Sequence, residues 1–269
     1  MLTKEVNYDY RKRLLELHKP GRYDRTIRPD ADEYVFRDGV KIILPDGCGE
    51  VTETAAKDFA DYLFTSMDVS AMPARSGEHG VRLALSRDLG EANERLGYRV
   101  TVGDDVLIEG FDERGIAQGL YHLEDIMNLR RAPYLKKGVE TRRTLLVPRI
   151  VMSGYGMNEY PDAYLAQLAH AGLTGLMLWI RGRNETLKGY CEFTDLALRA
   201  RKYGLDIYIQ SFVRHDVHPD DENAQAFYDA LYGELFKICP YIKGIVLVGE
   251  ACRFKSRDPE LPEGRNPGW

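Results

Sequence analysis

The hydrophobic pattern of the first 140 residues mixes the periods of helices and strands. Residues 55–64 place apolar side chains on one helical face, and Thr52 stands where the N-cap of that helix is expected. Two alternating segments, 98–102 and 106–110, are separated by three turn residues and predict a β-hairpin. The pattern favours a small α+β domain over residues 1–140.

A long helix is expected directly after this hairpin. Asp112 can cap its first turn, and Gly115 and Gly119 fall on its apolar side. Because glycine has no side chain, these positions allow close approach, so we expect the helix to pack tightly onto a sheet.

After Thr141 the hydrophobic pattern changes and predicts strands that alternate with helices. The predicted strands cover Leu145–Ser153, Thr174–Ile180, Leu205–Phe212 and Ile242–Glu250. Repeated strand–helix units imply a parallel sheet with right-handed crossovers. The predicted fold class is α/β, with residues 141–269 forming about four strand–helix units of a (β/α)₈-type barrel.

The last of these strands ends in the first candidate for chemistry. Its apolar run continues without a break to Val248, a pattern typical of a strand that is buried on both faces. Gly249 and Glu250 follow. Because α/β barrels hold their catalytic groups at the C-terminal ends of their strands, Glu250 is the leading catalytic candidate.

Composition and charge narrow the class of protein. The 269 residues carry a formal net charge of −5 and contain no block of basic residues, which argues against a nucleic-acid partner. No stretch is apolar enough to cross a bilayer, and the start of the sequence, residues 1–7, has no apolar signal-peptide core, so we expect no membrane partner and a cytoplasmic location. The four cysteines are far apart and form no C-x-x-C pair, and no cofactor is expected.

Several short motifs are similar to those of a known enzyme family. They are residues 112–123, the stretch Arg149-Ile150-Val151-Met152, and Val248-Gly249-Glu250. Together they resemble family 20 glycoside hydrolases, which include the β-N-acetylhexosaminidases, and more distantly family 67 α-glucuronidases. The resemblance implies a small α/β domain followed by a catalytic barrel, a carbohydrate substrate, and hydrolysis of a glycosidic bond.

Two departures from the family pattern bear on the substrate. The family pairs an aspartate, which orients the acetamido group of the substrate, with a glutamate that protonates the leaving oxygen. Gly249 stands at the position of that aspartate, and Gln210 stands where the third strand carries a glutamate. The resemblance therefore favours a changed substrate or lost activity over an ordinary hexosaminidase.

Each candidate site residue has a functional and a structural interpretation. Glu250 would be the general acid, or else an ion-paired loop carboxylate beside Arg253. By the resemblance Arg149 would bind sugar hydroxyls, although it would equally bridge the two domains. Trp179 would stack on a sugar ring or belong to the core.

Further candidates follow the second and third strands. Arg181 and Arg183 would bind hydroxyls or a uronate carboxylate, or form a solvated loop. Gln210 is a further sugar-binding candidate. Asp216, also a candidate for substrate binding, lies between His215 and His218, whose spacing is that of some metal ligands. With no further ligands in view, a polar loop is favoured there and no metal is predicted.

The length of the second part raises a question of completeness. A closed barrel takes about 250 residues, whereas the chain from residue 144 onward has room for only four strand–helix units. A half barrel would leave its outer strands unpaired. We therefore expect an N-terminal piece of a longer enzyme, or a barrel completed by a partner or by a second copy, with negligible turnover by this chain alone.

Two other functions remain open. A non-catalytic carbohydrate-binding or scaffolding protein would keep the fold without the catalytic pair, as Gly249 suggests. A lyase or aldolase would need a reactive lysine or a metal ion on a strand. Only Lys243 lies near a candidate strand end, and it is at the N-terminal end, whereas α/β barrels hold their catalytic groups at the C-terminal end.

Overall fold

The computed structural model describes residues 16–89, 96–152, 160–182, 184–186, 189–211, 215–249 and 252–260. Contacts divide the chain into two compact units. Unit 1 comprises Met1–Pro148, Pro161–Gly172 and Lys202–Gly204, and unit 2 comprises Arg149–Tyr160, Leu173–Arg201 and Leu205–Trp269. In the described part of the chain, no helix is both long enough and apolar enough to cross a membrane.

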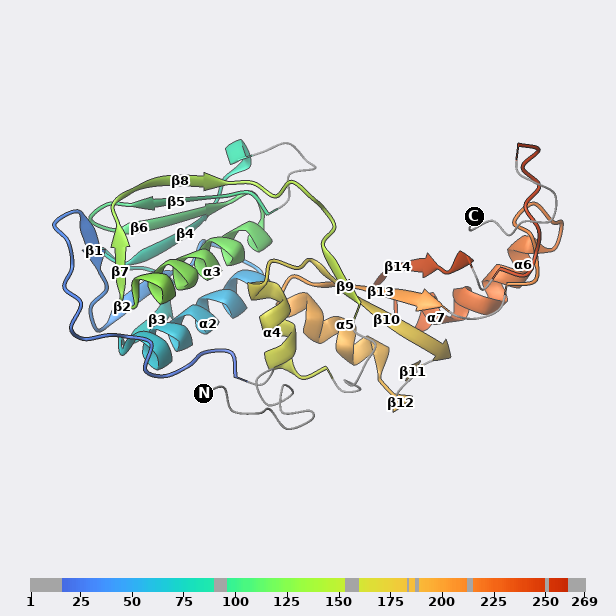
Figure 1. Ribbon diagram of the computed structural model, residues 1–269, viewed down its shortest axis with the longest axis horizontal. Coiled ribbons are helices and arrows are strands. Elements are labelled where there is room, and N and C mark those ends of the chain that lie inside the picture. The colour runs from blue at the N-terminus through green and yellow to red at the C-terminus, as the bar shows by residue number, and fades with distance from the viewer. Residues whose placement is uncertain are drawn as a thin grey trace, which may run out of the picture. The chain divides into compact units, whose positions relative to one another are not determined.

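Unit 1 contains a mixed six-stranded sheet in the order β3-β2-β4-β6-β5-β8 (Figure 1). Strands β3, β2, β4 and β6 run parallel, and β5 pairs antiparallel with both β6 and β8. The strands are β2 (Val40–Ile43), β3 (Ala71–Ala74), β4 (Val81–Leu85), β5 (Tyr98–Val102), β6 (Val106–Gly110) and β8 (Gly138–Arg142). A short 3₁₀ turn, Arg87–Leu89, follows β4.

Two long helices pack side by side along this sheet, α2 (Glu50–Met67) and α3 (Glu113–Arg130) (Figure 1). Their apolar faces and the inner face of the sheet form one core, in which residues such as Phe59, Leu120 and Ile108 are fully buried. Burial of this apolar surface is the main stabilising contribution to the unit.

The structure confirms the predicted hairpin and the helix that follows it. Strands β5 and β6 pair from Tyr98↔Gly110 to Val102↔Val106. The Asp112 side chain accepts a hydrogen bond from the backbone N–H of Gly115 at 2.8 Å, which is N-cap geometry. A Cβ added to Gly119 would lie 2.5 Å from Ile108 Cγ2, so this glycine does allow the helix to approach the sheet closely.

The prediction of Thr52 as an N-cap is wrong. Helix α2 begins three residues earlier than Thr52 would require, with Gly49 as its N-cap. A carboxylate from α3 takes over the capping role, because Glu113 accepts hydrogen bonds from the backbone N–H groups of Gly49 (2.6 Å) and Thr52 (3.2 Å). The negative charge also suits the positive end of the α2 dipole.

Unit 1 also contains a small two-stranded sheet. Strand β1 (Glu33–Val35) pairs antiparallel with β7 (Tyr134–Lys136), which follows α3. Arg130 of α3 donates to Glu33 at 2.7 and 3.0 Å, a two-pronged ion pair. This ion pair therefore attaches the short strand β1 to helix α3. One further helix, α4 (Asp162–His170), belongs to the same unit.

Unit 2 is built on four parallel strands in the order β9-β10-β13-β14 (Figure 1). They are β9 (Ile150–Met152), β10 (Gly175–Gly182), β13 (Asp206–Ser211) and β14 (Ile242–Leu247). A short hairpin, β11 (Glu185–Thr186) with β12 (Gly189–Tyr190), continues from β10 on the antiparallel side. The predicted succession of four parallel strands is confirmed, and a closed barrel is not seen in the described part of the chain.

The helices of unit 2 follow the predicted order with one difference. Helix α5 (Phe193–Lys202) lies between the second and third of the four parallel strands, where the alternation predicts a helix. The helix predicted between the third and fourth strands consists of α6 (Ala224–Tyr228), a π-helical turn (Asp229–Gly233) and α7 (Glu234–Ile238). The hydrogen-bonding pattern therefore changes within one continuous helical segment.

Two of the predicted strands differ from the expectation. The first predicted strand, β9, is only three residues long, and the residues before it, Leu145, Leu146 and Val147, are exposed. Pro148 lacks the N–H that a strand ladder needs, which accounts for a late start. The fourth predicted strand, β14, is an edge strand among the described residues, and its Leu247 is 57% exposed. Its apolar run therefore does not reflect burial on both faces.

Candidate functional site

The candidate site lies on one face of the parallel sheet of unit 2. Trp179 on β10 is in register with Gln210 on β13, and Gln210 is in register with Val246 on β14. Because side chains alternate along a strand, these three share one face of the sheet. The intervening residues Leu178 and Ile209 lie on the opposite face and are fully buried.

Trp179 and Gln210 offer the two kinds of group that bind a sugar ring. Both side chains are half-buried. The indole Nε1 of Trp179 donates to the Met152 sulfur of β9, which holds the ring in place. The Oε1 atom of Gln210 is buried and has no hydrogen-bond partner among the described residues. A buried acceptor without a partner costs stability, so it is an acceptor suited to a ligand hydroxyl.

One residue of this face was missed by sequence reasoning. Tyr208, two positions before Gln210, is in register with Met177 on one side and Gly244 on the other. A Cβ on Gly175 would lie 3.0 Å from the Tyr208 ring, and a Cβ on Gly244 would lie 3.5 Å from it. The signal was available, because glycine inside a strand often marks the close approach of another group.

The candidates near the end of β10 are followed by a side chain that contacts the next helix. Arg181 is exposed near the end of the strand, and Arg183 lies outside the described residues. Asn184 adopts a left-handed backbone conformation (φ 54°), and its side-chain oxygen accepts from the Phe193 N–H at 3.0 Å, at the start of α5. Its side chain thus binds the helix terminus.

Arg149 lies at the other end of the strands. Its backbone pairs with Thr174, directly before β10, with a Thr174 N–H to Arg149 carbonyl distance of 2.8 Å. Trp179 is five residues further along that strand, about 16 Å at 3.3 Å per residue. The Nε atom of Arg149 is buried and makes no hydrogen bond within the described chain.

The loop after β13 is held by its two histidines. The His215 Nε2 atom is 2.6 Å from the Tyr232 hydroxyl, and burial lowers the pKa of this imidazole, which favours its neutral form. His218 Nδ1 accepts from the Asp220 N–H at 3.1 Å. Both imidazoles therefore bind protein partners, and Asp216 between them is exposed.

Glu250 itself lies outside the described residues. Strand β14 ends at Leu247, and the Gly249 carbonyl accepts from the Cys252 N–H at 3.1 Å. Cys252 forms a parallel β-bridge with His215, so the chain segments that follow β13 and β14 remain adjacent beyond the two strands. The described residues on either side of it, Gly249 and Cys252, both follow the C-terminal end of β14.

No protein-family model matches the sequence, and no curated protein matches it. Solved structures do match. A mutant β-hexosaminidase from Streptomyces plicatus in complex with its product GlcNAc has a TM-score of 0.60 at 15% identity, over 88% of this chain and 60% of that enzyme. The GH20 β-N-acetylhexosaminidase of Streptomyces coelicolor A3(2) has a TM-score of 0.58 at 16% identity, over 88% and 60% of the two chains.

The fold is similar to that of GH20 β-hexosaminidases. The β-N-acetylhexosaminidase of Bacteroides fragilis matches as well, with a TM-score of 0.54 at 11% identity over 80% of this chain and 53% of that one. Glycoside hydrolases of families 84, 115 and 138 also match. Identities this low show the fold alone. This chain spans about 60% of the length of the first two GH20 enzymes.

Proposed function

We propose that this chain is part of a glycoside hydrolase in which the face carrying Trp179 and Gln210 receives a sugar and Glu250 is the general acid. The observation that carries the proposal is the Oε1 atom of Gln210, which is buried without a hydrogen-bond partner among the described residues, at a strand position in register with Trp179. An aromatic ring supplies the apolar surface for a sugar, and a fixed acceptor orients its hydroxyls. The similarity in fold to GH20 enzymes supports the same class of substrate.

The second catalytic group would come from strands beyond the four described here. Glycoside hydrolysis uses two carboxyl groups that flank the bond being cleaved. β9 and β14 each pair with one strand only among the described residues, and each offers an open edge on which a barrel would continue. Further strands, from a longer chain or from a partner, would pair there and contribute the second group.

Arg149, Arg181, Arg183 and Asp216 remain proposed sugar-binding residues. The exposed Arg181 lies near the C-terminal end of β10, and Asp216 follows β13, the neighbouring strand of the same parallel sheet. Charged groups at that end would bind hydroxyls or the carboxylate of a uronic acid. Arg149 directly precedes β9 and lies at the N-terminal end of the sheet. It would therefore contact a sugar only from that end of the strands.

The second candidate function is carbohydrate binding without catalysis. Gly249, where the family has an aspartate, favours it, because glycine cannot orient an acetamido group. The two functions differ in one measurable respect. A hydrolase needs Glu250, whereas a binding protein would bind sugar equally well with glutamine at that position.

The test compares two substrates that share one sugar but differ in leaving group. In the complete protein, Glu250→Gln should slow hydrolysis of an alkyl glycoside by about 10²- to 10⁴-fold, since general acid catalysis contributes that much. Hydrolysis of the dinitrophenyl glycoside should fall far less, because that leaving group departs without a proton. Glu260→Gln, which removes an exposed carboxylate nearby, is the matched control.

Equal losses on both substrates, or no loss on either, would show that Glu250 is not the general acid. Saturable sugar binding without hydrolysis of any substrate would favour the binding protein. Neither binding nor hydrolysis across aryl glycosides of hexoses, N-acetylhexosamines and hexuronic acids would refute both functions.

A further inference from the structure

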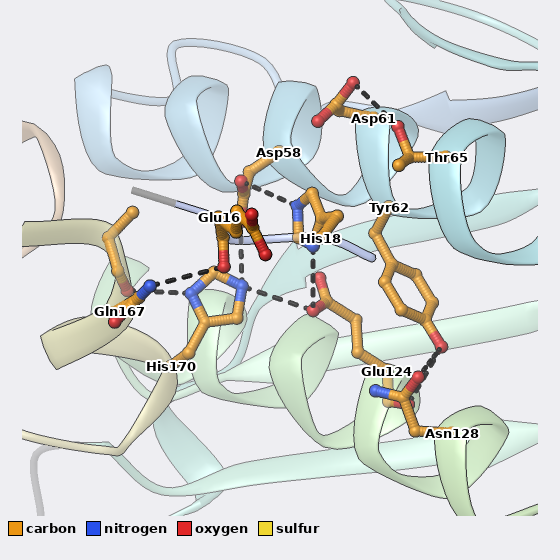
Figure 2. A network of polar contacts seen from close by, with 11 residues as sticks. Glu16, His18, Asp58, Asp61, Tyr62, Thr65, Glu124, Asn128, Gln167 and His170 are labelled. Atoms are coloured by element: carbon orange, nitrogen blue, oxygen red, sulfur yellow. Dashed lines mark hydrogen bonds and ion pairs between the residues drawn. The ribbon is translucent and has the colours of Figure 1, made fainter. Parts of the chain in front are cut away.

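Four titratable side chains meet inside unit 1, whereas the candidate sugar site belongs to unit 2. Figure 2 shows His18, from the segment before α2, together with Asp58 of α2, Glu124 of α3 and His170 at the end of α4. One ligand atom from each of the four lies within 4.8 Å of all the others. Their side chains are between 3 and 18% exposed, so the group is removed from bulk water.

Hydrogen bonds do not satisfy this cluster. The His18 Nε2 atom bonds to Asp58 Oδ1 at 3.1 Å. The His170 Nε2 atom lies at ion-pair distance from both carboxylates, 2.9 Å from Asp58 Oδ2 and 3.2 Å from Glu124 Oε2, but neither contact has the geometry of a hydrogen bond. Glu124 Oε1 is also buried without a partner among the described residues. Such groups are costly to bury unless something else binds them.

The orientation of His170 is set by its other nitrogen. Nδ1 lies 2.8 Å from the Ala166 carbonyl, an acceptor, so Nδ1 carries the proton. The Tyr121 ring stacks on the imidazole, with centroids 3.8 Å apart and planes at 29°. With its proton on Nδ1, the neutral imidazole would leave the lone pair of Nε2 free to bind a cation within reach of the two carboxylates. Metal-ligating histidines are oriented in the same manner, by a hydrogen bond from the second nitrogen.

A positive charge must therefore lie between these groups, either as protons or as a cation. With protons alone, burial raises the pKa of the Glu124 carboxyl to about 7. Burial opposes the charged form of His170, but Asp58 and Glu124 outweigh it and raise the pKa of His170 to about 10. A metal ion would replace the proton on each ligand nitrogen or oxygen when it binds.

We propose that His18, Asp58, Glu124 and His170 bind a divalent transition-metal ion of the zinc type. Two imidazoles and two carboxylates match zinc, whereas Ca²⁺ and Mg²⁺ prefer ligand sets made wholly of oxygen. Zinc bonds of about 2.0–2.2 Å place tetrahedral ligand atoms roughly 3.4 Å apart. The cluster is close to that spacing and would contract slightly around the ion.

The proposed site is structural. Four protein ligands complete a tetrahedral shell and leave no open position for a substrate. The ion would join three helices and the segment that precedes α2, because each of the four supplies one ligand. A cavity of about 530 Å³ lined by His18, Glu124 and His170 provides a path of entry.

The experiment measures metal binding by the untagged chain. After removal of metals with a chelator, the protein is titrated with Zn²⁺, and with Co²⁺ to record the visible spectrum. We expect one ion per chain, the strong visible bands of tetrahedral Co²⁺, and a rise in Tm of about 5 to 10 °C at Zn²⁺ 100-fold above Kd. Glu124→Gln and Asp58→Asn should each weaken binding at least about 100-fold, more than loss of an outer partner costs.

His79→Gln is the matched control. It removes an exposed imidazole, 3.2 Å from Asp105, and should leave Zn²⁺ affinity unchanged. Both cluster variants preserve side-chain volume, and far-UV circular dichroism checks their fold. If either fails to fold, the stoichiometry and the Co²⁺ spectrum of the wild type still decide. Absence of binding by the wild type, or unchanged binding by a folded Glu124→Gln or Asp58→Asn chain, would show a protonated ion-pair network instead.

Discussion

Gln210 on β13 stands directly opposite Trp179 on β10, and its buried Oε1 atom has no hydrogen-bond partner in the described chain. A buried acceptor in this state costs about 1–3 kcal/mol. The cost is offset when a ligand donates to the oxygen. The pair is therefore a place where stability and binding are expected to oppose each other.

Replacement of Gln210 by methionine tests this opposition. Methionine has a similar volume and removes the unpartnered oxygen, so Gln210→Met should raise the free energy of unfolding by about 1 kcal/mol. The same change should weaken sugar binding. Urea denaturation measures the first effect and titration with sugar the second. A loss of stability would show that Gln210 has a structural role instead.

Two helical glycines are expected to respond to alanine with opposite signs. At Gly119 the new Cβ would lie 2.5 Å from Ile108 Cγ2 in the core, so Gly119→Ala should cost about 1–3 kcal/mol of unfolding free energy. At Gly233 the nearest atom would be 3.8 Å away, and Gly233→Ala should stabilise by up to about 1 kcal/mol. Thermal denaturation compares both. Stabilisation by Gly119→Ala would contradict the close packing of α3 on the sheet.

The ion pair between Glu33 and Arg130 predicts a pH dependence. Hydrogen bonds from Arg130 lower the pKa of the Glu33 carboxyl below its ordinary value of 4.5. A lowered pKa means that the folded state favours the charged carboxylate. The stabilisation is therefore present above pH 4.5 and is lost as the pH falls through the folded-state pKa.

The measurement is urea denaturation of the wild type and Glu33→Gln as a function of pH. The variant should be less stable at pH 7, and the difference should shrink as the pH falls below about 4.5. Asp32→Asn, which alters a neighbouring exposed carboxylate, should show no comparable change. A difference in stability that stays constant with pH would show that the charge of Glu33 is not its cause.

Local patterns predicted much of the fold. The hairpin of β5 and β6, the Asp112 cap and the order of the four parallel strands follow from hydrophobic period and turn residues, which act within a few positions of the chain. The strand over Ala71–Ala74 was missed because it contains Pro73. The structure places it at the edge of its sheet, where proline is tolerated.

Features that depend on distant residues could not be predicted. The cap of α2 comes from Glu113, more than 60 positions along the chain from Gly49. The cluster of His18, Asp58, Glu124 and His170 likewise joins residues with no shared motif or spacing. The register of Trp179 with Gln210 depends on how the two strands pair. The sequence pattern of each strand predicts the strand, but not which of its residues lies beside which residue of its neighbour.

The most direct test of the proposed sugar site uses tryptophan fluorescence. The sequence contains only Trp179 and Trp269, so in a Trp269→Phe background the whole tryptophan signal reports on Trp179. This chain is titrated with hexoses, N-acetylhexosamines, hexuronic acids and their disaccharides. We predict a saturable change with at least one sugar class that Gln210→Met abolishes. No change with any sugar, or a change that persists in Gln210→Met, would contradict a sugar site on this face.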